Sequence, residues 1–214
     1  MMAVTINNGP MPTMSAIFTS GVTLMEKQEL INCWNYFLSL EKDLDNTSRY
    51  IEPMGQENVH SFEFAKILIL ACTEIEVLFN YLCKTISPSE TTGNIGRYKE
   101  VLLAAFPKIT SAEVSVMRWG KIISPFSGWD SGPLKWWGAY QNVKHNRSDN
   151  FNDASYENAA FSLAALYILI FYTAKANDIR FPNTKSIYLE SDYEDTNILH
   201  GPQKQLPDFE VTTK

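Results

Sequence analysis

Apolar residues recur every three or four positions over several long stretches of this chain, which is the period of an amphipathic helix. The first stretch covers residues 23–50 and opens on Thr23 and Glu26, which have the spacing of a capping box. The second, residues 60–87, is the longest, and a shorter one follows at residues 97–106. Both of these end directly before a proline, which cannot continue a helix. We expect three helices here.

After residue 106 the spacing of the apolar residues is no longer that of a helix. Short runs of alternating apolar residues, 113–116 and 121–123, flank a turn and predict a small β hairpin at about residues 113–124. A fourth helix is expected after Ser131 and Gly132, with Pro133 at its first position, running to about Arg147.

A fifth helix is expected over residues 156–175, capped by Asp153 or Ser155. Its residues 159–174 carry no charge, but 16 residues are fewer than the roughly 20 that cross a bilayer. We therefore predict a buried core helix and no membrane contact.

These elements predict an all-α fold, an up-and-down bundle of four or five helices with a small β-hairpin insertion and irregular termini. The bundle would span residues 23–176 of the 214, after a loose lead-in over 1–22. An acidic tail, 177–214, would be irregular apart from a strand-like run at 186–189.

Composition narrows the classes of function. Acidic residues outnumber basic ones by 24 to 18, a formal charge of −6, which argues against a DNA-binding protein. Three cysteines without a close pair indicate free thiols in a reducing, cytoplasmic compartment, and we expect Cys33 and Cys72 to be buried. The histidines are scattered and no C-x-x-C occurs, so we expect no zinc site and no cofactor. Nucleotide-binding glycine loops and zinc-protease or serine-hydrolase motifs are absent from the sequence.

Residues 136–147 hold most of the candidate functional side chains, because amide, imidazole and cationic side chains occur together at the end of one predicted helix. At 100° per residue, one side of that helix points into the core, and the opposite side is polar. The core side carries Trp136, Tyr140 and Val143; the polar side carries Gly138, Gln141, Asn142 and His145. The glycine allows close approach of a partner helix or ligand.

A helical bundle whose penultimate long helix ends in an Asn/His/Arg cluster, before a final apolar helix, resembles the HEPN superfamily. The resemblance covers residues 23–175. It implies a pair of Arg and His residues that cleaves RNA without a metal, often across a homodimer, in defence or toxin–antitoxin systems. In this sequence Tyr140 stands five residues before His145, and Arg147 follows the histidine, so the motif is rearranged.

Under this resemblance the catalytic candidates are His145, Arg147, Lys144 and Asn142. His145 would be the general base, because histidine is the residue type whose unperturbed pKa suits that role near neutral pH, and Arg147 and Lys144 would hold the phosphate. Asn142 would orient the imidazole or contact ribose. Arg147 and His145 converge only if the helix ends between them. The alternative is a solvated helix end whose cations complement the helix dipole.

Other candidates have a structural interpretation beside a functional one. Tyr140, Gln141 and Gly138 are candidate binding residues, together with Glu74, which borders the apolar stripe and would pair with Lys144 or Arg147. A structural ion pair or a solvated flank is the simpler account of Glu74. Four tryptophans would serve as packing or as platforms for nucleobases: Trp119, Trp129, Trp136 and Trp137.

Three functions remain open on this basis: a metal-independent endoribonuclease, a non-catalytic module that binds a partner chain or nucleotide, and a structural homodimer. RNA or a cognate antitoxin would be the partner.

Overall fold

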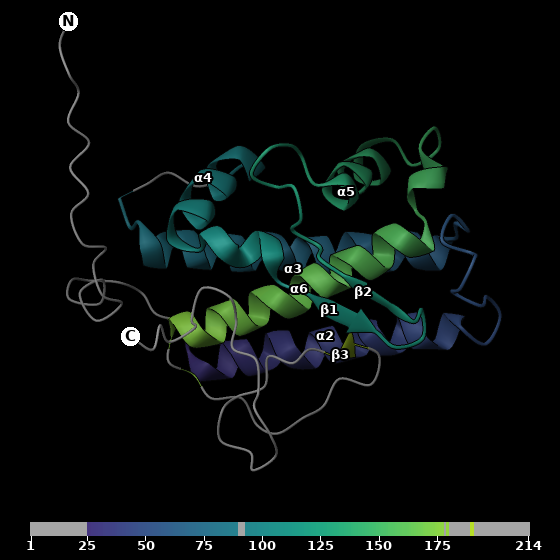
Figure 1. Ribbon diagram of the computed structural model, residues 1–214, viewed down its shortest axis with the longest axis horizontal. Helices are drawn as coiled ribbons and strands as arrows, with labels where there is room; N and C mark the ends of the chain where they lie inside the picture. The colour runs from purple at the N-terminus through teal and green to yellow at the C-terminus, as the bar shows by residue number, and fades with distance from the viewer. Residues whose placement is uncertain (1–24, 90–92, 178, 180–188, 191–214) are drawn as a thin grey trace, which may run out of the picture.

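The computed structural model describes residues 25–89, 93–177, 179 and 189–190, and confirms the all-α bundle with its small β insertion (Figure 1). The α-helices of this part of the chain are α2 (Lys27–Thr47), α3 (Phe62–Ile86), α4 (Ile95–Ala105), α5 (Lys135–Asn146) and α6 (Tyr156–Ala176). The short 3-10 helices η1 (Pro107–Ser111) and η2 (Phe151–Asp153) and the strands β1 (Val114–Val116), β2 (Lys121–Ile123) and β3 (Leu189–Glu190) complete it.

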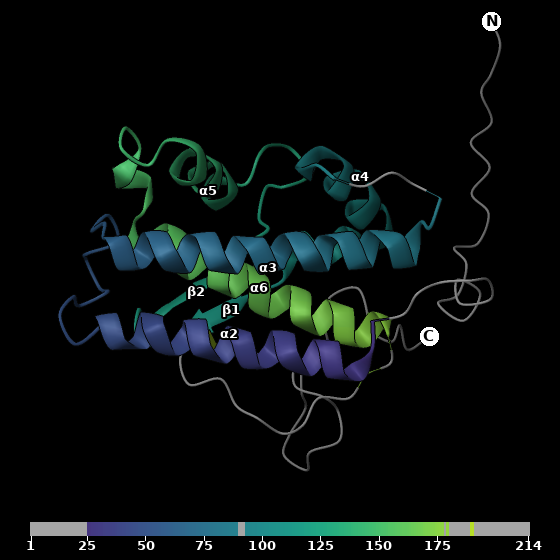
Figure 2. The same ribbon diagram turned by 180° about the vertical axis from the view of Figure 1, so that it is seen from behind.

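Helix α6 lies at the centre of the molecule. It packs against α2, α3 and α5, and strand β1 also contacts it (Figure 1). Seen from behind, α2 and α3 lie in front of α6 (Figure 2). Of its 21 residues, 17 are buried. By length and composition α6 could cross a membrane, but 83% of its most apolar window is buried, consistent with the core helix of a soluble protein.

Helix ends follow local chemistry, with two differences from the sequence prediction. The cap at the start of α2 lies at Glu26, whose N–H donates to Glu29 Oε2 at 3.2 Å, whereas Thr23 lies outside the described residues. Helix α5 begins two residues after Pro133, because Leu134 keeps an extended backbone and buries its side chain. Ser155 caps α6 as predicted, accepting from the N–H of Asn158 at 3.2 Å.

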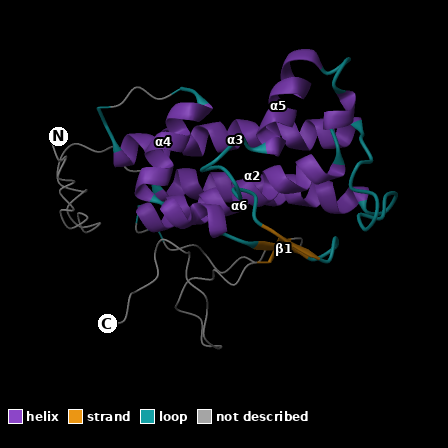
Figure 3. Cartoon of the chain, turned by 45° about the horizontal axis from the view of Figure 1, so that its top comes forward, coloured by secondary structure: helices purple, strands orange, loops and turns teal. Residues whose placement is uncertain are grey.

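The β insertion is part of a three-stranded antiparallel sheet with the order β2-β1-β3, which lies beside the long helices (Figure 3). The predicted hairpin is confirmed, with Val114 opposite Ile123 and Val116 opposite Lys121. On its other side β1 pairs with β3, which begins at the last residue of the strand-like run that we predicted at 186–189 in the tail. Of the predicted strand-like run, only its last residue lies within the described part.

Aromatic packing joins the shorter helices to α3. The Phe79 ring stacks on Trp129 at 5.5 Å between centroids and meets Trp137 at 5.9 Å. Trp119 and Trp136 are also buried, and no tryptophan of the candidate set is more than 7% exposed. These rings are therefore core packing, and their use as stacking platforms for nucleobases is excluded by burial.

Candidate functional site

The two sides of α5 are arranged as the helical period predicts. The residues that face the core are Trp136, Tyr140 and Val143, all buried, and Trp136 donates its indole N–H to the carbonyl of Pro125 at 2.8 Å. On the opposite side Gly138, Asn142 and His145 are exposed and Gln141 is half-buried. The polar side of α5 is thus accessible to a ligand or to a second copy of the chain.

His145 lies on the last turn of α5. Its ring makes no hydrogen bond or ion pair with any residue of the described ranges. A Cβ built on Gly138, two turns earlier on the same side, would meet no atom within 4 Å. The His145 ring and the helix surface at Gly138 are therefore both accessible.

Lys144 supplies a fixed positive charge next to His145. Its Nζ donates to the Tyr140 hydroxyl at 2.8 Å and lies 4.0 Å from Glu76 Oε1. The Tyr140 hydroxyl in turn donates to Glu76 Oε1 at 3.3 Å. The hydrogen bond with Tyr140 raises the pKa of Lys144, and burial raises the pKa of Tyr140. Both groups keep their protons at neutral pH, so the ammonium stays charged and positioned.

Arg147 points away from His145. Its backbone keeps a helical conformation (φ −60°, ψ −33°), so the chain does not break between the two residues. Two helical steps separate their directions by about 200°. The guanidinium lies over the ring of Phe62, 5.5 Å from its centroid. The convergence of Arg147 and His145 on one phosphate is therefore not found within a single chain.

The carboxylate that reaches α5 is Glu76. The predicted pairing of Glu74 with Lys144 or Arg147 is wrong. Residues 74 and 76 point about 200° apart on α3, so only one of them can face α5. Glu74 faces α2, where it accepts from the Cys33 thiol at 3.9 Å. Burial, with the charge of Glu74, raises the pKa of Cys33 to about 11. Cys33 itself is half-buried, contrary to our prediction, while Cys72 is buried as predicted.

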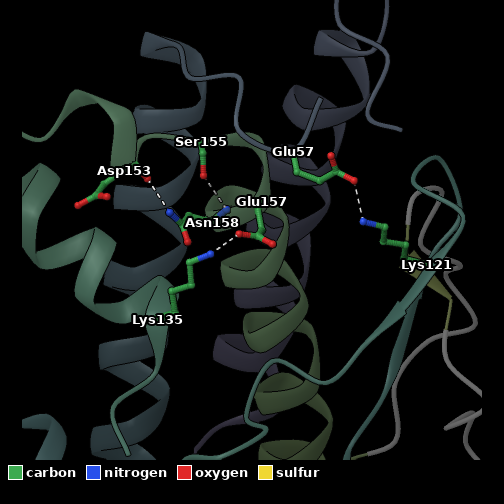
Figure 4. A network of polar contacts seen from close by, with 7 residues as sticks. All are labelled: Glu57, Lys121, Lys135, Asp153, Ser155, Glu157 and Asn158. Carbon is green, nitrogen blue, oxygen red and sulfur yellow. Dashed lines mark hydrogen bonds and ion pairs between the residues drawn. The ribbon is translucent and has the colours of Figure 1, made fainter. Parts of the chain in front are cut away.

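Asn142 joins α5 to η2 and does not orient the imidazole. Its Nδ2 donates to Asp153 Oδ2 at 2.7 Å. The carbonyl of Asp153 in turn accepts from Asn158 Nδ2 at 2.9 Å, at the start of α6 (Figure 4). The amide thus fixes the position of the helix end.

A polar network surrounds the start of α6 and was missed at the sequence level. Glu57 accepts from Lys121 at 2.7 Å, and Glu157 accepts from Lys135 at 2.6 Å (Figure 4). Glu57 also accepts from the indole N–H of Trp119 at 3.1 Å. The hydrogen bond from Lys121, with smaller contributions from the backbone and Trp119, lowers the pKa of Glu57 to about 2. This network holds segment 57–61 against the end of the bundle.

Beside this network lies a surface that we call the aromatic end patch: His60, Phe62, Phe151 and Arg147. The Phe62 and Phe151 rings are 4.9 Å apart, and the His60 ring meets Phe151 edge-on at 5.1 Å. Phe62 is 70% exposed. One signal was available in the sequence, because Phe62 lies about 200° from Phe64 and so off the apolar stripe of its helix.

No group of three His, Cys, Asp or Glu residues able to hold a metal ion occurs among the described residues. Comparisons with protein families, with curated proteins and with solved structures found no match. The assignment to the HEPN superfamily therefore stays a prediction from the sequence pattern.

Proposed function

We propose that this chain is a HEPN-like, metal-independent RNA endonuclease of the cytoplasm, of the defence or toxin–antitoxin type. The observation that supports the proposal is the pairing of an open imidazole, His145, with the positioned ammonium of Lys144 on the same helical turn. An accessible imidazole is a suitable general base for proton transfer, and a fixed cation stabilises charge on a phosphate.

The reaction that suits these groups is attack by the 2′-hydroxyl of RNA on the neighbouring phosphorus. His145 takes the 2′-hydroxyl proton while the O2′–P bond forms and the P–O5′ bond breaks. The leaving O5′ takes a proton from water or from the imidazolium of a second copy. Lys144 faces the negative phosphate oxygens, and Arg147, which points elsewhere, contacts a neighbouring nucleotide of the same strand.

A homodimer fits this chemistry, because a second copy would supply the group that one chain lacks beside His145. The exposed side of α5 has room for it at Gly138, and Gln141 lies between the two positions. Two such helices crossing at the glycine would place both histidines at one interface. The dimer is thus part of the proposal.

One observation favours a second candidate, a non-catalytic module that binds a nucleotide or a partner chain such as an antitoxin. No described side chain orients the His145 ring, because Asn142 is held by Asp153. General bases are commonly oriented by a hydrogen bond on their second nitrogen. Cleavage of RNA by the folded protein distinguishes the endonuclease from the non-catalytic module.

The test is cleavage of total RNA and tRNA in EDTA by the wild type, His145→Asn and Lys135→Ala. We expect the wild type to cleave and His145→Asn to lose activity by about 100-fold or more, the usual contribution of a general base. Helicity and Tm should stay unchanged in this variant, since the ring has no partner to lose. Lys135→Ala, at the other end of α5, is the control and should cleave normally.

Cleavage that survives in His145→Asn would contradict the catalytic role. RNA binding without cleavage by the folded wild type would favour the non-catalytic module. Light scattering on the same samples gives the oligomeric state, and a monomer at assay concentration would exclude the paired arrangement.

A further inference from the structure

The aromatic end patch is built on a rigid support. Three backbone hydrogen bonds join segment 57–61 to the start of α6: Ser61 N–H to Ala154 O (3.2 Å), Tyr156 N–H to Val59 O (2.9 Å) and Glu157 N–H to Glu57 O (3.0 Å). Phe62 is the first residue of α3 and Phe151 belongs to η2, which Asn142 ties to α5. The segments that carry the two rings are held in place before any ligand arrives, so little conformational entropy is lost on binding.

The charge of the patch suits a polyanion. Arg147 forms no ion pair within the described ranges, and its guanidinium lies over the exposed Phe62 ring, 5.5 Å from the centroid. Two carboxylates of the neighbouring segments are neutralised by ion pairs, Glu57 with Lys121 and Glu63 with Lys66. Asp149 accepts from the neutral amide of Asn146 and keeps its charge. Among the four residues that define the patch, Arg147 carries the fixed charge, and it is positive.

A pocket of about 370 Å³ continues the patch beyond His60. It is lined by Gly55, Gln56, Asn58, Val59 and His60. The side-chain amides of Gln56 and Asn58 have no hydrogen-bond partner among the described residues, and each offers donors and an acceptor. The volume lies within the range of small-ligand pockets. Ring faces, an amide-lined pocket and a cation are the groups that hold an unpaired nucleobase and its phosphate.

We propose that the aromatic end patch binds single-stranded RNA, with an unpaired base stacked on Phe62 and Phe151 and its phosphate on Arg147. The hydrogen-bonding edge of the base would enter the pocket at Gln56 and Asn58. This inference rests on the proposed function and adds to it the selection of an unpaired substrate. Because Arg147 lies two residues beyond His145, one strand can reach both the patch and the histidine.

The test measures binding of a labelled 2′-O-methyl oligouridine by fluorescence anisotropy. This probe lacks the attacking hydroxyl, so binding is read without cleavage. We expect Phe62→Ala to weaken affinity by about 5- to 100-fold, the range of one base–aromatic stack. Phe62→Trp should retain affinity. Ile122→Ala is the matched control, since Ile122 is 69% exposed on β2, outside the patch, and its removal should change affinity less than twofold.

Two further measurements address the phosphate and the base. Arg147→Ala should lower the slope of log affinity against log salt by about 0.7, the loss of one phosphate contact to a single strand. An abasic oligonucleotide should bind the wild type as weakly as the oligouridine binds Phe62→Ala.

Equal affinities of Phe62→Ala and Ile122→Ala would overturn the inference, and so would equal binding of single-stranded and duplex probes. If those results came with normal cleavage by the wild type, the proposed endonuclease function would be kept and the RNA-binding role of the patch would be rejected. A folded wild type that binds no RNA would overturn both and leave the patch to a protein partner. Loss of binding in Phe62→Ala together with full cleavage by His145→Asn would support the patch and contradict the catalytic role.

Discussion

Glu57 connects the loop before α3 to the β hairpin through a single carboxylate. Both Lys121 and Trp119 donate to its Oε1, at 2.7 Å and 3.1 Å. Because these donors favour the charged form, the pKa of Glu57 falls from 4.5 to about 2 in the folded protein. A carboxylate with a depressed pKa stabilises the fold above its unfolded pKa, and this stabilisation is lost as the pH falls toward 2.

We therefore predict a pH-dependent effect of Glu57→Gln. The variant should have a lower Tm than the wild type at pH 7, because the charged interaction with Lys121 is lost. The difference should narrow steadily between pH 5 and pH 2.5, because the Glu57 carboxylate of the unfolded chain binds a proton in this range while the folded one, with its pKa at about 2, does not. Thermal unfolding followed by circular dichroism over this range checks it. A difference in Tm that is independent of pH would contradict the assigned role of the charge.

At the level of elements, α5 combines a buried side that fixes it and an open side that remains available. Burial of Trp136 and Tyr140 sets the rotation of the helix, and this rotation presents His145 and Gly138 to solvent. Glycine in a helix costs up to about 1 kcal/mol relative to alanine, so its presence on the open side has no benefit for the isolated helix. Close approach by a second copy is the role we assign to it.

Gly138→Leu tests that role cleanly. A Cβ at this position meets nothing within 4 Å, so the monomer should tolerate the side chain and gain up to about 1 kcal/mol in unfolding free energy. The proposed homodimer should weaken, because the leucine would separate the two helices. Urea unfolding and light scattering across a concentration series check the two effects separately. An unchanged dimer would place the interface elsewhere on the molecule.

At the scale of the whole molecule, α6 is the element on which the others assemble. It packs against helices from both halves of the chain as well as β1. Few of its residues reach solvent, and many of its buried residues are alanine, leucine or isoleucine. Close packing of this kind makes the stability of the bundle depend on the volume of single α6 side chains.

We predict that Leu166→Ala lowers the unfolding free energy by about 2–5 kcal/mol, since Leu166 is fully buried in α6 and its loss leaves a cavity. Ile122→Ala, on the exposed side of β2, should cost less than about 0.5 kcal/mol. Urea unfolding of both variants measures the difference. Similar costs for the two substitutions would mean that α6 does not form the core.

The spacing of residues along the chain was enough to predict the helices, their approximate ends and the rotation of α5. Helix period and capping act over a few neighbouring residues, so the exposure of His145 and the burial of Tyr140 follow from spacing alone. The β hairpin was predictable for the same reason. By the helical period Phe62 falls outside the apolar stripe of α3, a signal that is visible in the sequence although the partners of Phe62 are not.

Which residues meet when they are far apart in the sequence depends on how the helices and strands pack. The choice of Glu76 over Glu74 beside Lys144 depends on how α3 and α5 pack, and the pairing of β3 with β1 depends on where the tail returns. The direction of Arg147 and the assembly of His60, Phe62 and Phe151 likewise require the ends of α3, α5 and η2 to lie together. Such contacts arise from the packing of whole elements, which local periodicity does not specify.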